Sequence, residues 1–364
     1  MINILIVIDG LPGGGAEKVV LTLAEGFLRA GHRVSLFSLR DVCEYPLPDG
    51  LTYRVIKDKC RAPWRKITEL TRRARLLDQA VQSSDEFDLV LSNLHKTDRI
   101  VSRSKYLPRH KVWFCLHGMF STSYLGHRTG LSRWLKKLKI KKVYQDRNIV
   151  TVSQAVADDL AHFELRPSQL KVIYNPFDID AIRLAAAQEC ELPPGSYLIH
   201  VGRFHENKRH DRLIQAYAES RIELPLVLLG QGSEAKTEKL KTLAQDLGVE
   251  DRVLFPGFRP NPYPFIRNAA MLVLSSDSEG FGNVLVEALL LGTPVVSTHC
   301  PGGPAEILQG ELARGLAQLN SHNLAQVMVD IYQNPPEINQ ETLSGFGIAP
   351  ICEQYCSLAK NAES

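Results

Sequence analysis

Two glutamates eight positions apart are the most unusual residues of this sequence. Glu279 precedes the turn Gly280-Phe281-Gly282, and Glu287 is the one charged residue in the apolar stretch Val284–Leu291. A helix of that composition has no polar face, so a carboxylate inside it needs a hydrogen-bonding or ligand-binding reason. Asn283 is of a residue type that caps helix N-termini. The alternative is a carboxylate near a positive helix end and a solvated loop residue.

Two cations stand close together in the segment "VGRFHENKRH". Arg203 directly follows a predicted strand, and Lys208 comes five residues later, just before the next predicted helix. The guanidinium fork of one and the ammonium of the other can neutralise a single diphosphate. A pair of solvated surface cations is the alternative reading of this segment.

Glycine-bearing turns follow three of the predicted strands. Besides Gly202 before the two cations, they are Gly13-Gly14-Gly15 and Gly230-Gln231-Gly232. Backbone N–H groups in such turns can approach an anion, because no Cβ atom obstructs them. The dinucleotide fingerprint G-x-G-x-x-G is nevertheless broken, since Lys18 stands where its third glycine should be, and no P-loop G-K-[ST] occurs. Each turn alone is a weak signal.

Two further polar residues lie just beyond predicted strands. His117 follows one in "CLHGMF", and Glu306 lies in "GGPAEI" beyond the strand Val295–Thr298. A lone histidine is often structural, so both residues are candidates only in company with the others. No metal site is predicted, because Asp277-Ser278-Glu279 departs from a D-x-D motif and no His/Cys cluster has zinc-ligand spacing.

The elements that must position these residues alternate between strands and helices, twice over. In the first half we expect strands at Asn3–Asp9, His32–Leu39, Asp88–Ser92, Lys111–His117 and Asn148–Val152. In the second half we expect strands at Ser196–Gly202, Leu224–Gly230, Arg252–Phe258, Ala269–Ser276 and Thr293–Thr298. The helices of that half are expected near Asp211–Ser220, Glu234–Leu247 and 283–291. The alternation predicts an α/β protein with two Rossmann-like, doubly wound parallel sheets facing across a cleft, and such sheets bind ligands beyond the carboxyl ends of their strands.

The domain boundary is expected in the turn-rich linker 174–194. The predicted domains are therefore residues 1–174 and 175–349, and the helical C-terminal segment 350–364 can pack back on the chain. The length of 364 residues suits two domains. The seven cysteines include no C-x-x-C pair and are expected to be reduced thiols. No apolar run approaches a membrane span and no signal sequence is evident, so a cytoplasmic protein is predicted.

Charge is divided unevenly between the two halves. Residues 1–175 carry 29 Lys and Arg against 17 Asp and Glu, whereas residues 176–364 carry 14 against 23. A basic half can bind nucleic acid, an anionic membrane surface or a phosphorylated substrate. The densest run, Arg133–Tyr144, places Trp134, Leu135, Leu138 and Ile140 among six Lys and Arg residues. That pattern is typical of an interfacial amphipathic helix, with a solvated basic helix as the alternative.

These pieces, in this order, resemble the retaining glycosyltransferases of family 4, which have the two-domain fold called GT-B and include transferases of bacterial envelope polysaccharide and lipopolysaccharide. The matching segments are Gly13-Gly14-Gly15-Ala16-Glu17, Gly202-Arg203 to Lys208, Gly230-Gln231-Gly232, and the E-x7-E element of Glu279 and Glu287 followed by "GTPVV" and "GGPAEI". The resemblance covers nearly the whole chain.

The resemblance implies roles for the residues that match. Glu287 would accept hydrogen bonds from ribose hydroxyls and Glu279 from hydroxyls of the transferred sugar, since a carboxylate suits two neighbouring donors. Arg203 and Lys208 would neutralise the departing diphosphate in place of a metal ion, and His117 would lie beside the donor sugar. The implied donor-binding set is Gly14, Gly15, Gly230, Gly280, Phe281, Gly282 and Glu287, with Glu306 as a further candidate.

The implied reaction is the metal-independent transfer of a hexose or N-acetylhexosamine from a nucleotide sugar, with UDP as the expected carrier and no cofactor. The expected acceptor is a lipopolysaccharide, a lipid-linked glycan or another envelope glycan, bound at the cytoplasmic face of the inner membrane; no nucleic acid partner is expected. One alternative is a non-catalytic subunit that binds nucleotides or carbohydrates. Another is a nucleotide-sugar oxidoreductase or epimerase, suggested by Asp41 and Tyr53-x3-Lys57, but the broken glycine fingerprint and the unexplained second half disfavour it.

Overall fold

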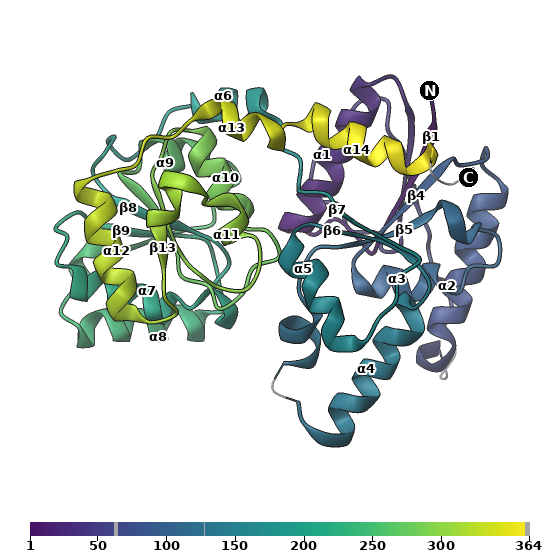
Figure 1. Ribbon diagram of the computed structural model, residues 1–364, viewed down its shortest axis with the longest axis horizontal. Helices are drawn as coiled ribbons and strands as arrows, with labels where there is room; N and C mark the ends of the chain where they lie inside the picture. Colours follow the sequence, from purple (N-terminus) through teal and green to yellow (C-terminus); the bar gives the residue numbers. More distant parts are fainter. Residues whose placement is uncertain (62–64, 127, 361–364) are drawn as a thin grey trace. The chain divides into compact units, whose positions relative to one another are not determined.

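A computed structural model describes residues 1–61, 65–126 and 128–360 of the chain (Figure 1). The chain forms two compact units, one of Met1–Phe177 with Phe346–Ser364 and one of Asp178–Gly345. We call them the first and second unit and describe each by itself. The sequence suggested a boundary after residue 174 and a return after 349; the units divide a few residues away, after Phe177 and Gly345.

The first unit is built on a seven-stranded sheet in which every pairing is parallel, in the order β3-β2-β1-β4-β5-β6-β7. The strands are β1 (Asn3–Ile8), β2 (Arg33–Ser38), β3 (Thr52–Val55), β4 (Leu89–Asn93), β5 (Val112–Leu116), β6 (Asn148–Thr151) and β7 (Gln169–Val172). The central strands β1, β4 and β5 are buried along their whole length. Their continuous apolar runs are typical of a parallel sheet covered on both faces.

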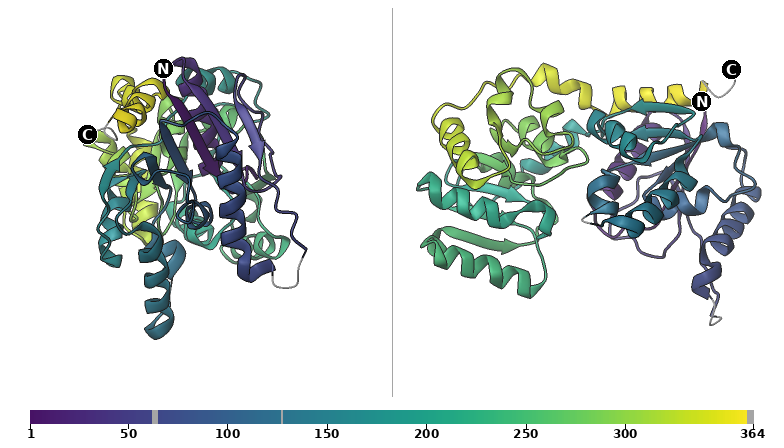
Figure 2. Two further views of the ribbon diagram at one scale, coloured as in Figure 1. Left: turned by 90° about the vertical axis from the view of Figure 1, so that its right-hand side faces the viewer. Right: turned by 60° about the horizontal axis from the view of Figure 1, so that its bottom comes forward.

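Helices cover this sheet. They are α1 (Gly15–Arg29), α2 (Arg65–Gln82), α3 (His95–Val101), α4 (Gly130–Tyr144), α5 (Gln154–Asp159) and α14 (Ile348–Lys360). A one-turn π-helix at Ser121–Leu125 precedes α4, and short 3-10 turns lie at Arg109–Lys111 and Leu160–Phe163. In Figure 1 and Figure 2, α4 projects away from the sheet of this unit.

The C-terminal helix α14 packs beside α1 in the first unit (Figure 1). Phe27 of α1 and Tyr355 of α14 meet edge to face with ring centroids 6.3 Å apart. A Cβ atom at Gly26 would lie 2.4 Å from Cys352 Sγ, so the glycine allows the two helices to approach closely. The predicted C-terminal segment 350–364 therefore belongs to the first unit as far as Lys360; residues 361–364 lie outside the described residues.

The second unit has a six-stranded parallel sheet in the order β10-β9-β8-β11-β12-β13. Its strands are β8 (Leu198–Val201), β9 (Leu226–Leu229), β10 (Val253–Gly257), β11 (Met271–Leu274), β12 (Val295–Thr298) and β13 (Leu316–Ala317). Its helices are α6 (Ile179–Ala186), α7 (His210–Ser220), α8 (Glu234–Asp246), α9 (Tyr263–Asn268), α10 (Asn283–Leu290), α11 (Pro304–Ile307), α12 (Ser321–Gln333) and α13 (Gln340–Leu343). Short 3-10 turns lie at Glu206–Lys208, Glu250–Arg252, Gly310–Gly315 and Ser344–Phe346.

Three details differ from the sequence-based expectation. The edge strands β7 and β13 were not anticipated, because β7 has one apolar residue exposed at 39% and β13 is only two residues long. The expected linker 174–194 contains the helix α6. Asn283 is not the N-cap of α10: Gly282 holds that position with a φ of 101°, a conformation that favours glycine, and Asn283 is the first helical residue.

Both sheets reverse their strand order at one point. In the first unit the reversal lies between β1 and β4, and in the second between β8 and β11. Open parallel sheets bind ligands outside the carboxyl ends of their strands at such a switch point. The loops that follow these four strands are therefore where a ligand is expected.

Candidate functional site

In the second unit, the loops at the switch point carry the two cations and the first glutamate predicted from the sequence. The loop Gly202–Arg209 follows β8, and the loop Ser275–Gly282 follows β11. Asn207 joins the loops, because its Nδ2 donates to Ser278 O at 2.6 Å and its carbonyl accepts from the Asp277 N–H at 2.8 Å. The fold thus brings together residues that are about 70 positions apart in the sequence.

Lys208 and Glu279 are direct partners in this site. Lys208 Nζ lies 2.6 Å from Glu279 Oε1, and the two side chains are 26% and 11% exposed. Ser276 also donates a hydrogen bond to the same carboxylate oxygen. Arg203 is exposed at the rim of this loop and has no ion-pair partner among the described residues. The arrangement offers two cations and one carboxylate to a ligand at the switch point.

Close backbone contacts explain two of the glycine turns. Gly230, with φ at 152°, lies so near the Gly202 carbonyl that a Cβ atom would be 2.0 Å from its oxygen. Gly302, with φ at 127°, would place a Cβ 1.7 Å from the carbonyl oxygen of Glu279. Neither position can hold another residue without moving backbone, so these glycines set the loops after β8 and β11 against their neighbours.

Glu287 is buried on α10 with 8% of its surface exposed. Tyr263, the first residue of α9, donates its hydroxyl to Glu287 Oε1 at 3.1 Å. Tyr263 was not predicted from the sequence, because it lies 24 positions away on another helix. The hydrogen bond orients the carboxylate that the resemblance assigns to the ribose.

The other predicted donor-binding residues of this unit lie on the same two loops or next to them. Phe281 is 3% exposed, so its side chain belongs to the core and its backbone is the part available to a ligand. Gly280 precedes it on the loop after β11, and Glu306 is half-buried on α11. Glu306 follows the Gly302–Gly303 turn that packs against the Glu279 loop.

In the first unit, His117 follows β5 at the carboxyl edge of the sheet. His117 Nε2 lies 2.9 Å from Asn93 Oδ1, and Asn93 Nδ2 donates to the Leu91 carbonyl at 3.2 Å. These contacts place the hydrogen of His117 on Nε2 and leave Nδ1 as an acceptor, which is buried without a hydrogen-bond partner in the described part of the chain. Burial lowers the pKa of His117 to about 4, so the imidazole is neutral at pH 7.

Gly14 and Gly15 also lie in the first unit, in the turn between β1 and α1. Gly14 is the N-cap residue of α1 and Gly15 its first residue. The Gly14 carbonyl accepts a hydrogen bond from the Tyr45 hydroxyl at 3.2 Å, and Glu17 folds back toward this turn. The structure therefore places both glycines at the β1 side of the first switch point, on a different unit from Lys208 and the glutamate pair.

A second buried polar network lies at the β4 side of that switch point, and the sequence did not indicate it. Tyr144 donates its hydroxyl to Asp98 Oδ2 at 2.6 Å and lies 2.9 Å from His95 Nδ1, while Ser92 donates to Asp98 Oδ1 at 2.6 Å. Burial raises the pKa of Asp98 to about 8 and lowers that of His95 to about 4. Leu94, between the strand and His95, has a positive φ of 75°. Such conformations in a bulky residue concentrate at functional sites.

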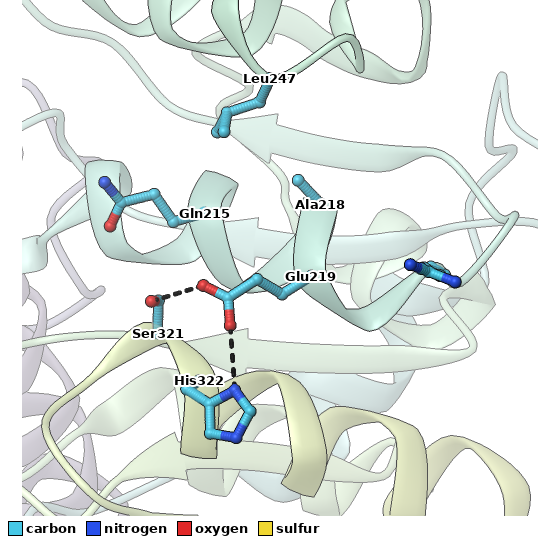
Figure 3. Close-up of a pocket in the computed structure, with 7 residues that line it drawn as sticks. Gln215, Ala218, Glu219, Leu247, Ser321 and His322 are labelled. Atoms are coloured by element: carbon cyan, nitrogen blue, oxygen red, sulfur yellow. Dashed lines mark hydrogen bonds and ion pairs between the residues drawn. The ribbon is translucent and has the colours of Figure 1, made fainter.

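A hollow of about 690 Å³ lies elsewhere on the second unit, between α7, α12 and the end of α8 (Figure 3). Glu219 is at its centre, accepting a hydrogen bond from Ser321 Oγ at 2.7 Å and lying 3.4 Å from His322 Nδ1. None of the residues predicted to bind the donor lines it. It is a surface feature separate from the switch-point site.

Comparison with known proteins assigns both halves of the chain. Residues 13–181 match the family model described as Glycosyltransferase Family 4, and residues 191–344 match the model described as Glycosyl transferases group 1. The chain belongs to glycosyltransferase family 4. The match in each half excludes the oxidoreductase or epimerase alternative and identifies an enzyme of glycosyl transfer.

Named relatives of this glycosyltransferase act on a sugar linked to diphospho-undecaprenol or on lipopolysaccharide. It is 26% identical over 327 residues to the N-acetylgalactosamine-N,N'-diacetylbacillosaminyl-diphospho-undecaprenol 4-alpha-N-acetylgalactosaminyltransferase of Campylobacter jejuni, covering 87% of this chain and 86% of that protein. It is also 26% identical over 207 residues to the lipopolysaccharide 1,6-galactosyltransferase of Escherichia coli, covering 52% of this chain and 56% of that protein.

Solved structures share the fold of this glycosyltransferase. The crystal structure of Anabaena HepE in complex with UDP and glucose superposes with a TM-score of 0.79 at 21% identity, covering 99% of this chain and 100% of that one. The lipopolysaccharide outer core galactosyltransferase WaaB superposes with a TM-score of 0.72 at 17% identity, with full coverage of both chains. The expected GT-B fold of two Rossmann-like domains is therefore confirmed.

In the described part of this glycosyltransferase, no helix is both long and apolar enough to cross a bilayer. No group of three or more His, Cys, Asp and Glu side chains in residues 1–61, 65–126 and 128–360 has an arrangement that would hold a metal ion.

Proposed function

We propose that this glycosyltransferase moves a hexose or N-acetylhexosamine from a UDP-linked donor to a lipid-linked glycan, a lipopolysaccharide or another envelope glycan, with retention of the anomeric configuration. The observation that carries the proposal is the pairing of Lys208 with Glu279 at the switch point of the second unit. Named relatives that transfer galactose or N-acetylgalactosamine to such acceptors support the substrate class. The UDP bound to a structural neighbour supports the carrier.

In the proposed complex, the donor replaces the hydrogen bonds and ion pairs that these side chains now make with one another. Lys208 and Arg203 neutralise the diphosphate, Glu279 accepts hydrogen bonds from hydroxyls of the transferred sugar, and Glu287 accepts them from the ribose. The acceptor oxygen forms a bond to the anomeric carbon while the bond from that carbon to the diphosphate breaks. The acceptor proton passes to the departing phosphate. Cations of the protein replace a divalent ion, so the reaction is proposed to need no metal.

We also propose that α4 places the enzyme on an anionic membrane surface. Its apolar residues Leu131, Trp134, Leu135 and Leu138 are 70%, 55%, 46% and 43% exposed, and lie on a helix with six Lys and Arg side chains. Ile140 was expected among these apolar residues, but it is fully buried and helps to anchor the helix to the first unit. Exposed apolar residues mixed with cations suit the boundary of a bilayer.

A panel of nucleotide sugars tests the donor assignment. Thermal unfolding is recorded with UDP-, GDP- and ADP-linked sugars, each against its free nucleoside diphosphate, and donors that raise the melting temperature are then assayed for release of the diphosphate. We expect UDP-galactose, UDP-glucose or their N-acetylated forms to give the largest shift. A shift confined to GDP or ADP compounds would overturn the UDP assignment, and no shift with any donor would overturn the site.

A further inference from the structure

A cluster of charged side chains next to the proposed donor site links the loop after β8 to the loop after β11. Asp277 Oδ1 accepts a hydrogen bond from Arg212 Nη2 at 2.6 Å, and Arg209 Nη1 lies 3.2 Å from its Oδ2. Both arginines belong to the start of α7, and Asp277 belongs to the loop after β11. We call these three residues the Asp277 clamp.

Arg212 is the buried half of the clamp. Its side chain is 6% exposed, and besides Asp277 it donates from Nη1 to the Ser275 carbonyl at 2.9 Å. A buried guanidinium needs a carboxylate partner and filled donors, since an uncompensated charge inside a protein is strongly unfavourable. Arg212 therefore holds both ends of the segment Ser275–Asp277 against α7.

Arg209 is the half-buried member of the clamp, and its backbone is unusual. Its φ is 48° and its ψ 51°, the left-handed conformation that few residues other than glycine adopt readily. Its guanidinium binds Asp211 through Nε and Nη2 at 2.9 Å each, as well as Asp277, and the hydrogen bonds to Asp211 hold the pKa of Arg209 above its ordinary value. These ion pairs stabilise the turn that directly follows Lys208.

The clamp reaches the proposed catalytic pair through the backbone. Ser275 Oγ donates to the Lys208 carbonyl at 2.7 Å, and Asp277 stands two residues before Glu279. Lys208 and Glu279 thus sit on two turns whose neighbouring residues are tied together by the clamp. Without these contacts, the long side chain of Lys208 could adopt many rotamers.

On the assumption of the proposed function, we infer that Asp277, held between Arg209 and Arg212, is a positioning residue for the reaction. It fixes the Lys208 turn and the Glu279 turn relative to each other, so that the cation meets the diphosphate and the carboxylate meets the sugar of the same donor. In this role, Asp277 itself contacts neither the diphosphate nor the sugar. Its side chain is 43% exposed, so its contribution rests on the geometry of the two arginines rather than on strong electrostatics.

The variant Asp277→Asn keeps the shape of the side chain and removes its charge. We expect UDP affinity, measured by calorimetry, to fall roughly tenfold, and kcat for UDP-sugar turnover to fall by a further factor of roughly ten, because small misplacements of reacting groups carry such losses. Hydrogen exchange of the amides in 275–282 should accelerate in the variant without ligand.

Two control variants separate positioning from general destabilisation. Asp330→Asn removes the carboxylate of an exposed ion pair with Arg314, at 3.0 Å in the same unit, and should leave UDP affinity near the wild-type value. Tyr217→Phe, on the same helix as Arg212, removes a half-buried hydrogen bond to the Leu224 carbonyl beyond that helix, at 2.9 Å. It should lower the melting temperature without changing UDP affinity or kcat per folded molecule.

Loss of Arg212's counter-ion can prevent Asp277→Asn from folding, so Arg209→Gly provides an independent test. Glycine accepts the left-handed backbone but has no guanidinium, and we expect it to weaken UDP binding and turnover to a smaller extent than Asp277→Asn. The inference would be overturned if Lys208→Met loses turnover while a folded Asp277→Asn or Arg209→Gly variant keeps the UDP affinity and kcat of the wild type. Wild-type turnover in Lys208→Met would instead overturn the proposed site itself.

Discussion

Lys208 Nζ and Glu279 Oε1 lie 2.6 Å apart, although the residues are 71 positions apart in the sequence and stand on loops after different strands. The cation proposed for the leaving diphosphate and the carboxylate proposed for the transferred sugar are thus each other's partners. An ion pair of this kind compensates two partly buried charges until a ligand replaces it by supplying an anion for the lysine and hydroxyls for the glutamate.

Lys208→Met should abolish most of the turnover and little of the stability. The variant removes a cation aimed at charge that develops on the leaving group, and loss of one such group costs on the order of 10²–10³ in kcat. Arg203→Ala should act in the same direction. The measurement is the rate of UDP release from the UDP-sugar, together with the melting temperature. Lys236→Met on α8, whose side chain is 42% exposed, is the matched control and should behave as wild type.

Glu287→Gln should weaken donor binding while the fold is retained. The amide keeps an oxygen for the Tyr263 hydroxyl, but it is a poorer acceptor for two ribose hydroxyls than a carboxylate. Calorimetry with UDP and with 2′,3′-dideoxy-UDP makes the test specific. The variant should lose affinity for UDP only, by roughly tenfold, the equivalent of about 1.4 kcal/mol. An equal loss for both nucleotides would show that Glu287 does not bind the ribose.

Much of this fold follows from local sequence signals, and the site follows from them only in part. The buried parallel strands are recognisable in the sequence as short apolar runs, so β1, β8 and β11 were predicted to within two residues. The loops after β8 and β11 were therefore placed correctly at one sheet edge. The contact of Tyr263 with Glu287 and the clamp at Asp277 depend on how α7, α9 and α10 pack, and no spacing in the sequence encodes that packing.

Chelation of divalent ions should leave activity largely unchanged. The proposal assigns neutralisation of the diphosphate to Arg203 and Lys208, so a metal has no remaining task at that position. Turnover is measured before and after dialysis against EDTA, with magnesium and manganese added back to separate samples. Activity that disappears with EDTA and returns with either ion would contradict the assignment.

Stability should fall as the pH drops from about 6.5 toward 4. His200 is fully buried on β8, its Nδ1 lies 2.8 Å from the Val273 carbonyl, and burial lowers its pKa to about 4. Because the folded pKa lies below the unfolded value of 6.5, the histidine contributes stability that is present above pH 6.5 and lost as the pH falls through 4. The difference in pKa corresponds to a loss on the order of 3 kcal/mol.

Urea unfolding at several pH values, followed by fluorescence, measures this loss. His200→Gln keeps an N–H for the Val273 carbonyl and cannot be protonated, so its free energy of unfolding should depend less steeply on pH between 6.5 and 4 than that of wild type. His117 has a pKa lowered in the same direction but lies in the first unit. His117→Gln should therefore reduce the pH dependence of unfolding of that unit. Identical slopes in wild type and His200→Gln would refute the role of His200.

The first unit shows where sequence reasoning is weakest. His117 was predicted from its place after a strand, but Asn93, which sets its tautomer, and the network of Asp98, Tyr144 and His95 were not. His95 and Tyr144 lie 49 positions apart, and each of these residues is of a type common in ordinary cores. Only their shared position at the carboxyl edge of β4 and β5 gives them significance.

Helix α4 should bind the enzyme to an anionic membrane surface. Each Lys or Arg near an anionic leaflet contributes about 1 kcal/mol, and α4 carries Arg133 and five lysines. We expect the enzyme to sediment with vesicles that contain anionic lipid at low ionic strength, to dissociate as salt reaches several tenths molar, and to ignore zwitterionic vesicles. Lys136 is excluded from the test variant, because its Nζ lies 4.1 Å from the centroid of the Tyr124 ring and has a structural contact to lose.

The test variant changes Lys137, Lys139 and Lys142 to Gln, and the matched control changes Lys236, Lys239 and Lys241 on α8 of the second unit. Both lose three charges, but only the first should lose sedimentation, since the membrane face is assigned to α4. UDP affinity should be unchanged in the first variant, because the proposed donor site lies in the second unit. Equal loss in both variants would show that net charge rather than α4 governs binding. No sedimentation of the wild type would remove the membrane from the proposal and leave the basic first unit to an anionic acceptor.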